Sequence, residues 1–191
     1  MSRLLDSILV IDVSVTCWAG DPPPGQQSEI LEIGICPVDI RSARVQETHS
    51  LVIVPETSLV SAYCSRVTKI EARDLDRGLT FATACRALAR EYGAGHRAWA
   101  SYGNHVRRII KNQCANRSIS YPFGATHINL KSLIAILKAQ PEERSLPDTM
   151  LELNLPLTGA RHRAADRAYN AALILSRLLM EHRMKLLGGT N

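Results

Sequence analysis

Ile8-Leu-Val-Ile-Asp-Val-Ser-Val-Thr-Cys-Trp18 is the stretch of this 191-residue chain that decides its fold. Four apolar residues lead into Asp12, after which valine alternates with Ser14 and Thr16. A short run of this kind is typical of a strand buried on both faces of a sheet. A carboxylate in such a strand is costly to leave unpaired. We therefore expect Asp12 to meet a metal, a cation or backbone N–H donors.

Composition indicates a globular protein of one domain. The length suffices to bury a core, and 46% of the residues are hydrophobic and 21% charged. The formal net charge of +5 permits an anionic partner.

No apolar run is long enough to span a bilayer. Asp6 and Asp12 interrupt the apolar residues near the start of the chain, which is not typical of a signal peptide. Because the five cysteines contain no C-x-x-C pair, we expect reduced thiols and a cytoplasmic protein without membrane contact.

Basic residues gather in two parts of the chain. The first group holds six basic residues against Asp166 and Glu181, namely Arg161, Arg163, Arg167, Arg177, Arg183 and Lys185. The second group consists of Arg107, Arg108, Lys111 and Arg117. These basic groups are either solvated faces of helices or a surface that binds nucleic-acid phosphates, and the sequence leaves both interpretations open.

The rest of the chain shows strand and helix patterns in a definite order. Further strands are predicted over residues 29–40, 45–54 and 97–101, the first three strands forming an antiparallel meander around a turn at 41–44. Helices are predicted after an N-cap at Thr68 and over 80–93, 104–115, 129–138, 151–155 and 163–186. This order predicts an α/β or α+β fold with a mixed sheet. A single domain over 6–186 is expected, with tails at 1–5 and 187–191.

Several segments match, in order, the motifs of one enzyme family. These are Asp12–Trp18 for D-x-E-x-T-C-W, Glu29–Gly34 for a second strand, Leu59–Ile70 for L-S-x-F-C-x-x-L-T-x-I, Ser101–Arg108 for S-W-G-x-x-D, Tyr121–Phe123, Asn129–Lys131, and His162–Asn170 for H-x-x-x-D-D-x-x-N. The chain thereby resembles the DEDDh group of 3′–5′ exonucleases, and within it the small exonucleases that trim RNA 3′ ends. The resemblance implies an RNase H-like mixed sheet flanked by helices.

The resemblance also implies a site in which four carboxylates hold two divalent cations and a histidine acts as general base. Asp12 matches the first carboxylate, and His162 matches the histidine. The three other ligand positions carry Ser14, Val106 and Arg167. Hydroxyl and carbon side chains are poor ligands for hard cations, and a guanidinium repels them. We therefore expect Asp12 to bind metal weakly or not at all and no resident cofactor, with Mg²⁺ or Mn²⁺ only in an active enzyme.

Neighbouring acids are the other candidates for metal ligands. Asp166 precedes the ligand position by one residue, which turns a helical side chain by about 100°, and the family often has an acid there as well. Glu29 and Glu32 fall on a strand where the family also carries acids. Asn104, two positions before Val106, is neutral. The resemblance therefore does not assign any of these residues as a replacement for a missing ligand.

Arg167 has two interpretations that the sequence leaves open. Its guanidinium can form a structural ion pair with Asp12 in a pocket that binds no ligand, or it can bind a phosphate of a nucleic acid 3′ end. Trp18 and Tyr102 are candidates both for stacking on bases and for ordinary core packing. Together with Thr16 and Arg167, they form the set of predicted nucleic-acid contacts.

Three functions are therefore expected as alternatives. The first is a degenerate exonuclease that binds the 3′ end of single-stranded RNA or DNA, RNA being favoured, with little or no catalysis. The second is an active metal-dependent 3′–5′ exonuclease with a site rebuilt from Asp12, His162, Asp166 and one strand acid. The third is a regulatory module that binds a protein partner and no nucleic acid.

Overall fold

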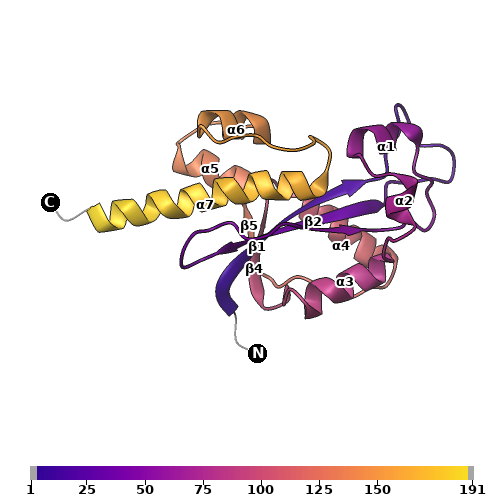
Figure 1. Ribbon diagram of the computed structural model, residues 1–191, viewed down its shortest axis with the longest axis horizontal. Coiled ribbons are helices and arrows are strands. Elements are labelled where there is room, and N and C mark those ends of the chain that lie inside the picture. Colours follow the sequence, from indigo (N-terminus) through magenta and orange to yellow (C-terminus); the bar gives the residue numbers. More distant parts are fainter. Residues whose placement is uncertain (1–3, 189–191) are drawn as a thin grey trace.

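The stretch around Asp12 forms the central strand of a five-stranded sheet in the order β3-β2-β1-β4-β5 (Figure 1). The strands are β1 (Leu4–Val15), β2 (Ile30–Asp39), β3 (His49–Val52), β4 (Arg97–Ser101) and β5 (His127–Asn129). The first three pair antiparallel, whereas β4 pairs parallel with both β1 and β5. The computed structural model describes residues 4–188. It confirms the expected mixed sheet and antiparallel meander.

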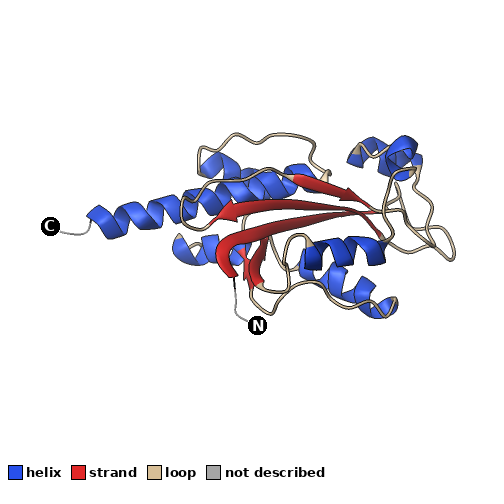
Figure 2. Ribbon diagram, turned by 60° about the horizontal axis from the view of Figure 1, so that its bottom comes forward, coloured by secondary structure: helices blue, strands red, loops and turns tan. Residues whose placement is uncertain are grey.

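Helices cover both faces of this sheet (Figure 2). They are α1 (Ala62–Thr68), α2 (Ala72–Leu75), α3 (Phe81–Arg90), α4 (His105–Asn116), α5 (Leu130–Leu137), α6 (Leu146–Glu152) and α7 (Ala164–Gly188). α3 and α4 pack on one face, and α5, α6 and α7 pack on the other. α1 and α2 lie beside the end of β1 (Figure 1). No helix within residues 4–188 has the length and apolarity needed to cross a membrane.

The alternation of side chains along β1 decides which layer each residue meets. Leu9 and Ile11 belong to the core cluster under α3 and α4, whereas Ile8 and Val10 belong to the cluster under α7. Successive side chains of a strand point to opposite faces. The even-numbered series therefore continues to Asp12, which faces α7.

The close approach of α7 to β2 depends on Gly34. A Cβ built on Gly34 would overlap the backbone of Ala164, the first residue of α7. Glu32, two residues earlier on the same face, accepts a hydrogen bond of 2.7 Å from the Ala164 N–H. A small residue and a buried acceptor on β2 thus set the position at which α7 begins.

Several local predictions are wrong at element ends. Thr68 ends α1 and bonds back to the Cys64 carbonyl, and Glu71 is the N-cap of the helix that follows. The helix expected at 151–155 is α6, which begins earlier because Ser145 caps it. The strand expected at 45–54 pairs continuously only over β3, and the short strand β5 was not predicted. Of the expected tails, residues 1–3 and 189–191 lie outside the described residues.

Replacement of Gly34 by alanine tests this packing. The added methyl group has to displace the start of α7, so Gly34→Ala should lower the free energy of unfolding by about 1–3 kcal/mol, the range of overpacked core substitutions. Urea unfolding followed by circular dichroism measures this change. Gly20→Ala is the matched control, because a Cβ there meets nothing within 4 Å. Equal stabilities of the two variants would contradict the proposed role of Gly34.

Candidate functional site

Asp12 and Arg167 form an ion pair at the junction of β1 and α7. Asp12 is 3% exposed, and the Arg167 side chain is 24% exposed. Arg167 Nη2 donates to Asp12 Oδ1 and to the Val13 carbonyl at 2.9 Å, while the Val13 N–H donates to the same carboxylate at 2.6 Å. Of the expected partners of Asp12, the structure shows a cation, Arg167, and a backbone donor, the Val13 N–H.

Ser14 and Glu32 hold the segment that precedes α7. Ser14 Oγ donates to the His162 carbonyl at 2.7 Å, so this hydroxyl fixes the loop. Glu32 is fully buried and accepts from the Ala164 N–H at 2.7 Å, and Arg163 Nε lies 3.4 Å from its other oxygen. Both side chains thus position the loop and the start of α7.

Two residues at or next to family ligand positions, Val106 and Asp166, make structural contacts instead. Val106 is fully buried in the core cluster under α4. Asp166 Oδ2 accepts from the Ala160 N–H at 2.7 Å, and Gly159, at φ +76°, leaves no room for a Cβ beside this carboxylate. Asp166 therefore stabilises the loop before α7.

A cavity of about 850 Å³ opens beside the ion pair. Its walls come from β1, the start of α4, the start of α6, and the loop before α7. Among the sequence-predicted residues, Asp12, Tyr102, His162 and Arg167 line it together. His105 also lines this cavity. It is not among the predicted site residues, because the family motif S-W-G-x-x-D has its acid at the next position, which is Val106 here.

Both histidines of this cavity have lowered pKa values. For His105, partial loss of hydration lowers the pKa below 6.5, Asp12 opposes this change, and Arg167, Arg108 and Lys131 add to it. For His162, burial and then the charges of Arg167 and Arg161 lower the pKa. Both imidazoles are therefore neutral at pH 7 and can gain a proton when an anion binds.

The other predicted nucleic-acid contacts differ in accessibility. Thr16 is fully buried, and its Oγ1 accepts from the Glu29 N–H at 2.9 Å, so its hydroxyl faces the interior. Trp18 is half-buried in the loop after β1. Tyr102 is 7% exposed, and its hydroxyl contacts Thr149 Oγ1 at 2.6 Å. Tyr102 thus presents part of its ring to the cavity while its hydroxyl is engaged in packing.

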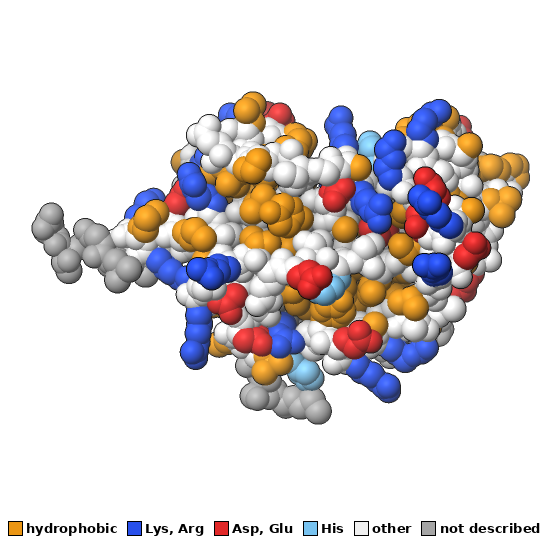
Figure 3. Space-filling view, in the orientation of Figure 1, with side chains coloured by type: hydrophobic (Ala, Val, Ile, Leu, Met, Phe, Trp, Pro, Cys, Tyr) orange, Lys and Arg blue, Asp and Glu red, His pale blue; other side chains and the backbone are white. Residues whose placement is uncertain are grey.

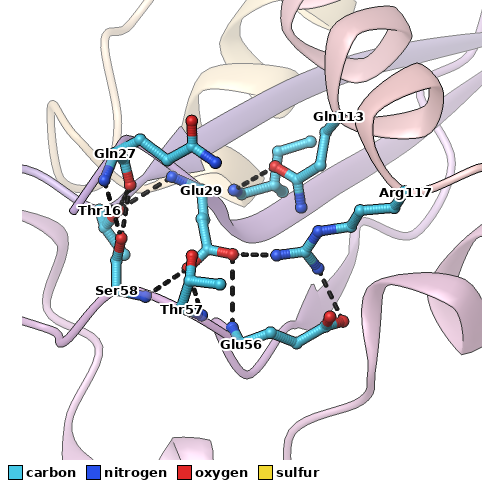
Figure 4. A network of polar contacts seen from close by, with 9 residues as sticks. Thr16, Gln27, Glu29, Glu56, Thr57, Ser58, Gln113 and Arg117 are labelled. Atoms are coloured by element: carbon cyan, nitrogen blue, oxygen red, sulfur yellow. Dashed lines mark hydrogen bonds and ion pairs between the residues drawn. The ribbon is translucent and has the colours of Figure 1, made fainter. Parts of the chain in front are cut away.

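Glu29 lies in a separate polar network, shown in Figure 4. It is 2% exposed and accepts from the Thr57 N–H at 3.0 Å and the Ser58 N–H at 2.7 Å. Arg117 forms an ion pair with Glu29 and a second with Glu56. Burial alone would raise the pKa of Glu29, but these hydrogen bonds and Arg117 lower it overall. Glu29 is therefore a buried structural anion.

Much of the predicted basic surface is engaged in internal contacts. Arg117, Arg163, Arg167 and Arg177 pair with carboxylates, and Arg183 donates to backbone carbonyls. On the face shown in Figure 3, Lys and Arg side chains gather between the start of α7 and α1. Two of the arginines, Arg161 and Arg167, line the cavity itself.

The donor set does not fit a pair of divalent cations. Asp12 is bound to Arg167, and Ser14, Val106 and Asp166 are used in packing and loop contacts. Within residues 4–188, no three His, Cys, Asp or Glu side chains lie together as metal ligands. A guanidinium beside the first carboxylate opposes the charge that two dications require.

The fold and the motifs define a member of a nuclease family. The profile of the RNase_T family, described as Exonuclease, matches residues 9–175. The chain belongs to this family. The human 3'-5' exoribonuclease 1 is 25% identical over 186 residues, which cover 92% of this chain and 53% of that protein. The chain thus spans about half of this relative's length.

Solved structures of DEDDh exonucleases share the fold. The nuclease domain of 3'hExo, a DEDDh family member, bound to rAMP, superposes with a TM-score of 0.83 at 22% identity and covers 95% of both chains. A structure of 3'-end specific recognition of histone mRNA stem-loop by 3'-exonuclease has a TM-score of 0.80 at 23% identity and covers 95% of this chain and 84% of that chain. The expected RNase H-like fold is confirmed.

Removal of Arg167 tests the ion pair. Arg167→Gln leaves Asp12 as an unpaired buried charge, which should cost about 2–4 kcal/mol in the free energy of unfolding, since the pair is partly solvated. Asp12→Asn combined with Arg167→Gln should recover most of this loss. Chemical denaturation of the three proteins measures both effects.

Arg177→Gln serves as the control on the same helix. Arg177 pairs with Glu181 across one turn, and its side chain is 44% exposed, so its loss should cost less than about 0.5 kcal/mol. If Arg167→Gln were as mild as this control, Asp12 would not depend on Arg167.

Proposed function

We propose that this chain binds the 3′ end of a single-stranded nucleic acid, RNA being favoured, in the cavity beside Asp12 and Arg167, with little or no catalysis. The observation that supports it best is the guanidinium of Arg167, which stands beside the carboxylate in a cavity large enough for a nucleotide. Arginine suits phosphate because its planar fork donates two parallel hydrogen bonds.

The geometry of Arg167 leaves it able to bind a phosphate. It contacts Asp12 and Val13 through the single atom Nη2, and its side chain remains a quarter exposed toward the cavity. His105, Arg161 and His162 line the same cavity. A phosphate entering it would meet one fixed cation, a second arginine and two imidazoles that can take up protons.

Weak or absent catalysis follows in this proposal from the residues at the ligand positions. In-line hydrolysis of a phosphodiester by two metals needs enough carboxylates to hold both cations, which stabilise the attacking and the leaving oxygen. Here Ser14 and Val106 cannot supply that charge, and Arg167 opposes it. His162 then lacks a metal-bound water from which to take a proton, so we propose that no resident metal is part of this site.

The preference for RNA is supported by relatives. The human protein that matches most of this chain is named as an exoribonuclease, and two structural neighbours are described with rAMP and with a histone mRNA stem-loop. For this chain, RNA and a 3′ end remain the proposed ligand.

Four purified proteins test the proposal, namely the wild type, Asp12→Asn, Arg167→Gln and the double variant. Binding of a labelled single-stranded RNA is measured by fluorescence anisotropy at several salt concentrations. Loss of the guanidinium should weaken binding about 10- to 100-fold, as for a charge-assisted hydrogen bond, both in Arg167→Gln and in the more stable double variant. Asp12→Asn should bind as well as the wild type or better, because Arg167 is no longer neutralised.

Cleavage of the same RNA with Mg²⁺ or Mn²⁺ is assayed in parallel. The expected result is no metal-dependent shortening and a steep decrease of affinity with salt. Metal-dependent release of nucleotides that Asp12→Asn abolishes would show an active exonuclease. Absence of RNA binding in all four folded proteins would favour a protein-interaction module.

The affinity for RNA should also rise as the pH falls. Because the pKa values of His105 and His162 are lowered, both are neutral in the free protein at pH 7. A bound phosphate favours their protonated forms, so binding takes up protons and strengthens between about pH 7 and pH 5. Anisotropy titrations of the wild type and of His105→Gln combined with His162→Gln measure this. An unchanged pH slope in the double variant would contradict the role of the imidazoles.

A further inference from the structure

A second pocket lies on the opposite side of the end of β1. Its volume is about 420 Å³, and its walls include Val15, Gln27, Ile109 and Gln113. Val15 follows Asp12 by three residues, about 10 Å along a strand, and it packs against the core cluster under α3 and α4. The two pockets therefore share β1 but open on its two faces.

Gln113 contributes a buried donor to this pocket. It is 8% exposed, and its Oε1 accepts from the Ile30 N–H at 2.8 Å. Since that backbone donor needs an acceptor, the amide orientation is settled, and Nε2 points away from Ile30 on the side of Arg117 (Figure 4). Within residues 4–188, Nε2 has no hydrogen-bond partner. An unpaired buried N–H is costly, and a ligand acceptor would remove this cost.

At the inner end of the pocket, the groups available to a ligand are mainly hydrogen-bond donors. Glu29 lines it, but its carboxylate is used by Thr57, Ser58 and Arg117. The groups left for a ligand there are the amide of Gln113 and the guanidinium edge of Arg117. A carbonyl oxygen is the complementary group.

The outer part of the pocket suits a planar, neutral ring. Val15 and Ile109 give it half-buried apolar sides, and the exposed carboxamides of Gln27, Asn112 and Asn116 surround the opening. Carboxamides recognise nucleobases through paired donors and acceptors, and apolar side chains pack on their faces. The pocket carries no unpaired charge of the kind that a phosphate would require.

One face of α4 connects this pocket to the cavity. His105, Arg108, Asn112 and Asn116 are all exposed, and their spacing of three, four and four residues places them on one side of the helix. His105 lines the cavity, and Asn112 and Asn116 line the second pocket. Arg108 lies between them, where a backbone phosphate would pass.

From this arrangement we propose that the second pocket is a nucleobase subsite for an upstream residue of the strand whose 3′ end occupies the cavity, and that it selects uracil and guanine, which carry a carbonyl at positions 4 and 6, over cytosine and adenine, which carry an amine there. This inference rests on the function proposed above. The strand runs from Arg167 past His105 and along the exposed face of α4. The base enters between Val15 and Ile109, and its carbonyl accepts from Gln113 Nε2.

Matched pyrimidine oligomers test the subsite. Oligouridine and oligocytidine of equal length differ at position 4, where uracil has a carbonyl and cytosine an amine. The wild type should bind oligouridine about 5- to 10-fold more tightly in an anisotropy titration. Gln113→Glu keeps an acceptor for the Ile30 N–H and replaces the donor by an acceptor, so the preference should move to oligocytidine.

Asn112→Ala combined with Asn116→Ala should weaken binding of both oligomers without loss of stability, because both side chains are exposed and alanine favours a helix. Gln46→Ala, an exposed carboxamide outside the pocket, is the control and should bind as the wild type does. Thermal unfolding of each variant verifies its fold.

The outcomes separate this subsite from the proposed function. Equal binding of the two oligomers by the wild type, with affinity still lost in Arg167→Gln, overturns the subsite and leaves the cavity as the binding site. A preference for uridine that persists in Gln113→Glu also overturns it. No binding of either oligomer by the folded wild type overturns both.

Discussion

The structure depends on how three buried carboxylates at one end of the sheet are neutralised. Asp12 pairs with Arg167, Glu32 lies near Arg163, and Glu29 pairs with Arg117. A buried carboxylate without a partner would cost several kcal/mol. The arginines come from helices or loops on both faces of the sheet, so each ion pair also connects a covering layer to the central strands. Removal of one partner would therefore affect the charge of the site and the position of a helix together.

This arrangement changes the chemistry of the cavity relative to the family pattern. Where the family places carboxylates for cations, this chain places a hydroxyl that fixes a loop, a core valine and a guanidinium. Positive charge and neutral imidazoles then favour an anionic ligand over metal ions. The same fold can thus serve recognition of a phosphate, because function belongs to the site and not to the architecture.

The two pockets on either side of β1 differ in charge in a way that fits a single ligand. The first contains two arginines and two imidazoles that can bind a phosphate, and the second is lined by carboxamides and apolar side chains and suits a base. α4 contributes to both, since its first turn reaches the cavity and its last turns reach the second pocket. A nucleic acid strand presents these two chemistries at regular intervals along its length.

Apolar periodicity and ordered motifs are local properties, so the sequence alone was enough to predict the α/β class, the central strand around Asp12, the family and the replaced ligand positions. It also predicted Arg167 as the neighbour of Asp12, since both fall on positions that the family brings together. The folded structure was needed to show that Ser14 holds the loop before α7, that Asp166 accepts a hydrogen bond from Ala160, and that Gln113 has an unpaired donor. These contacts join residues distant in sequence or depend on the path of a loop, and no local pattern of residues carries that information.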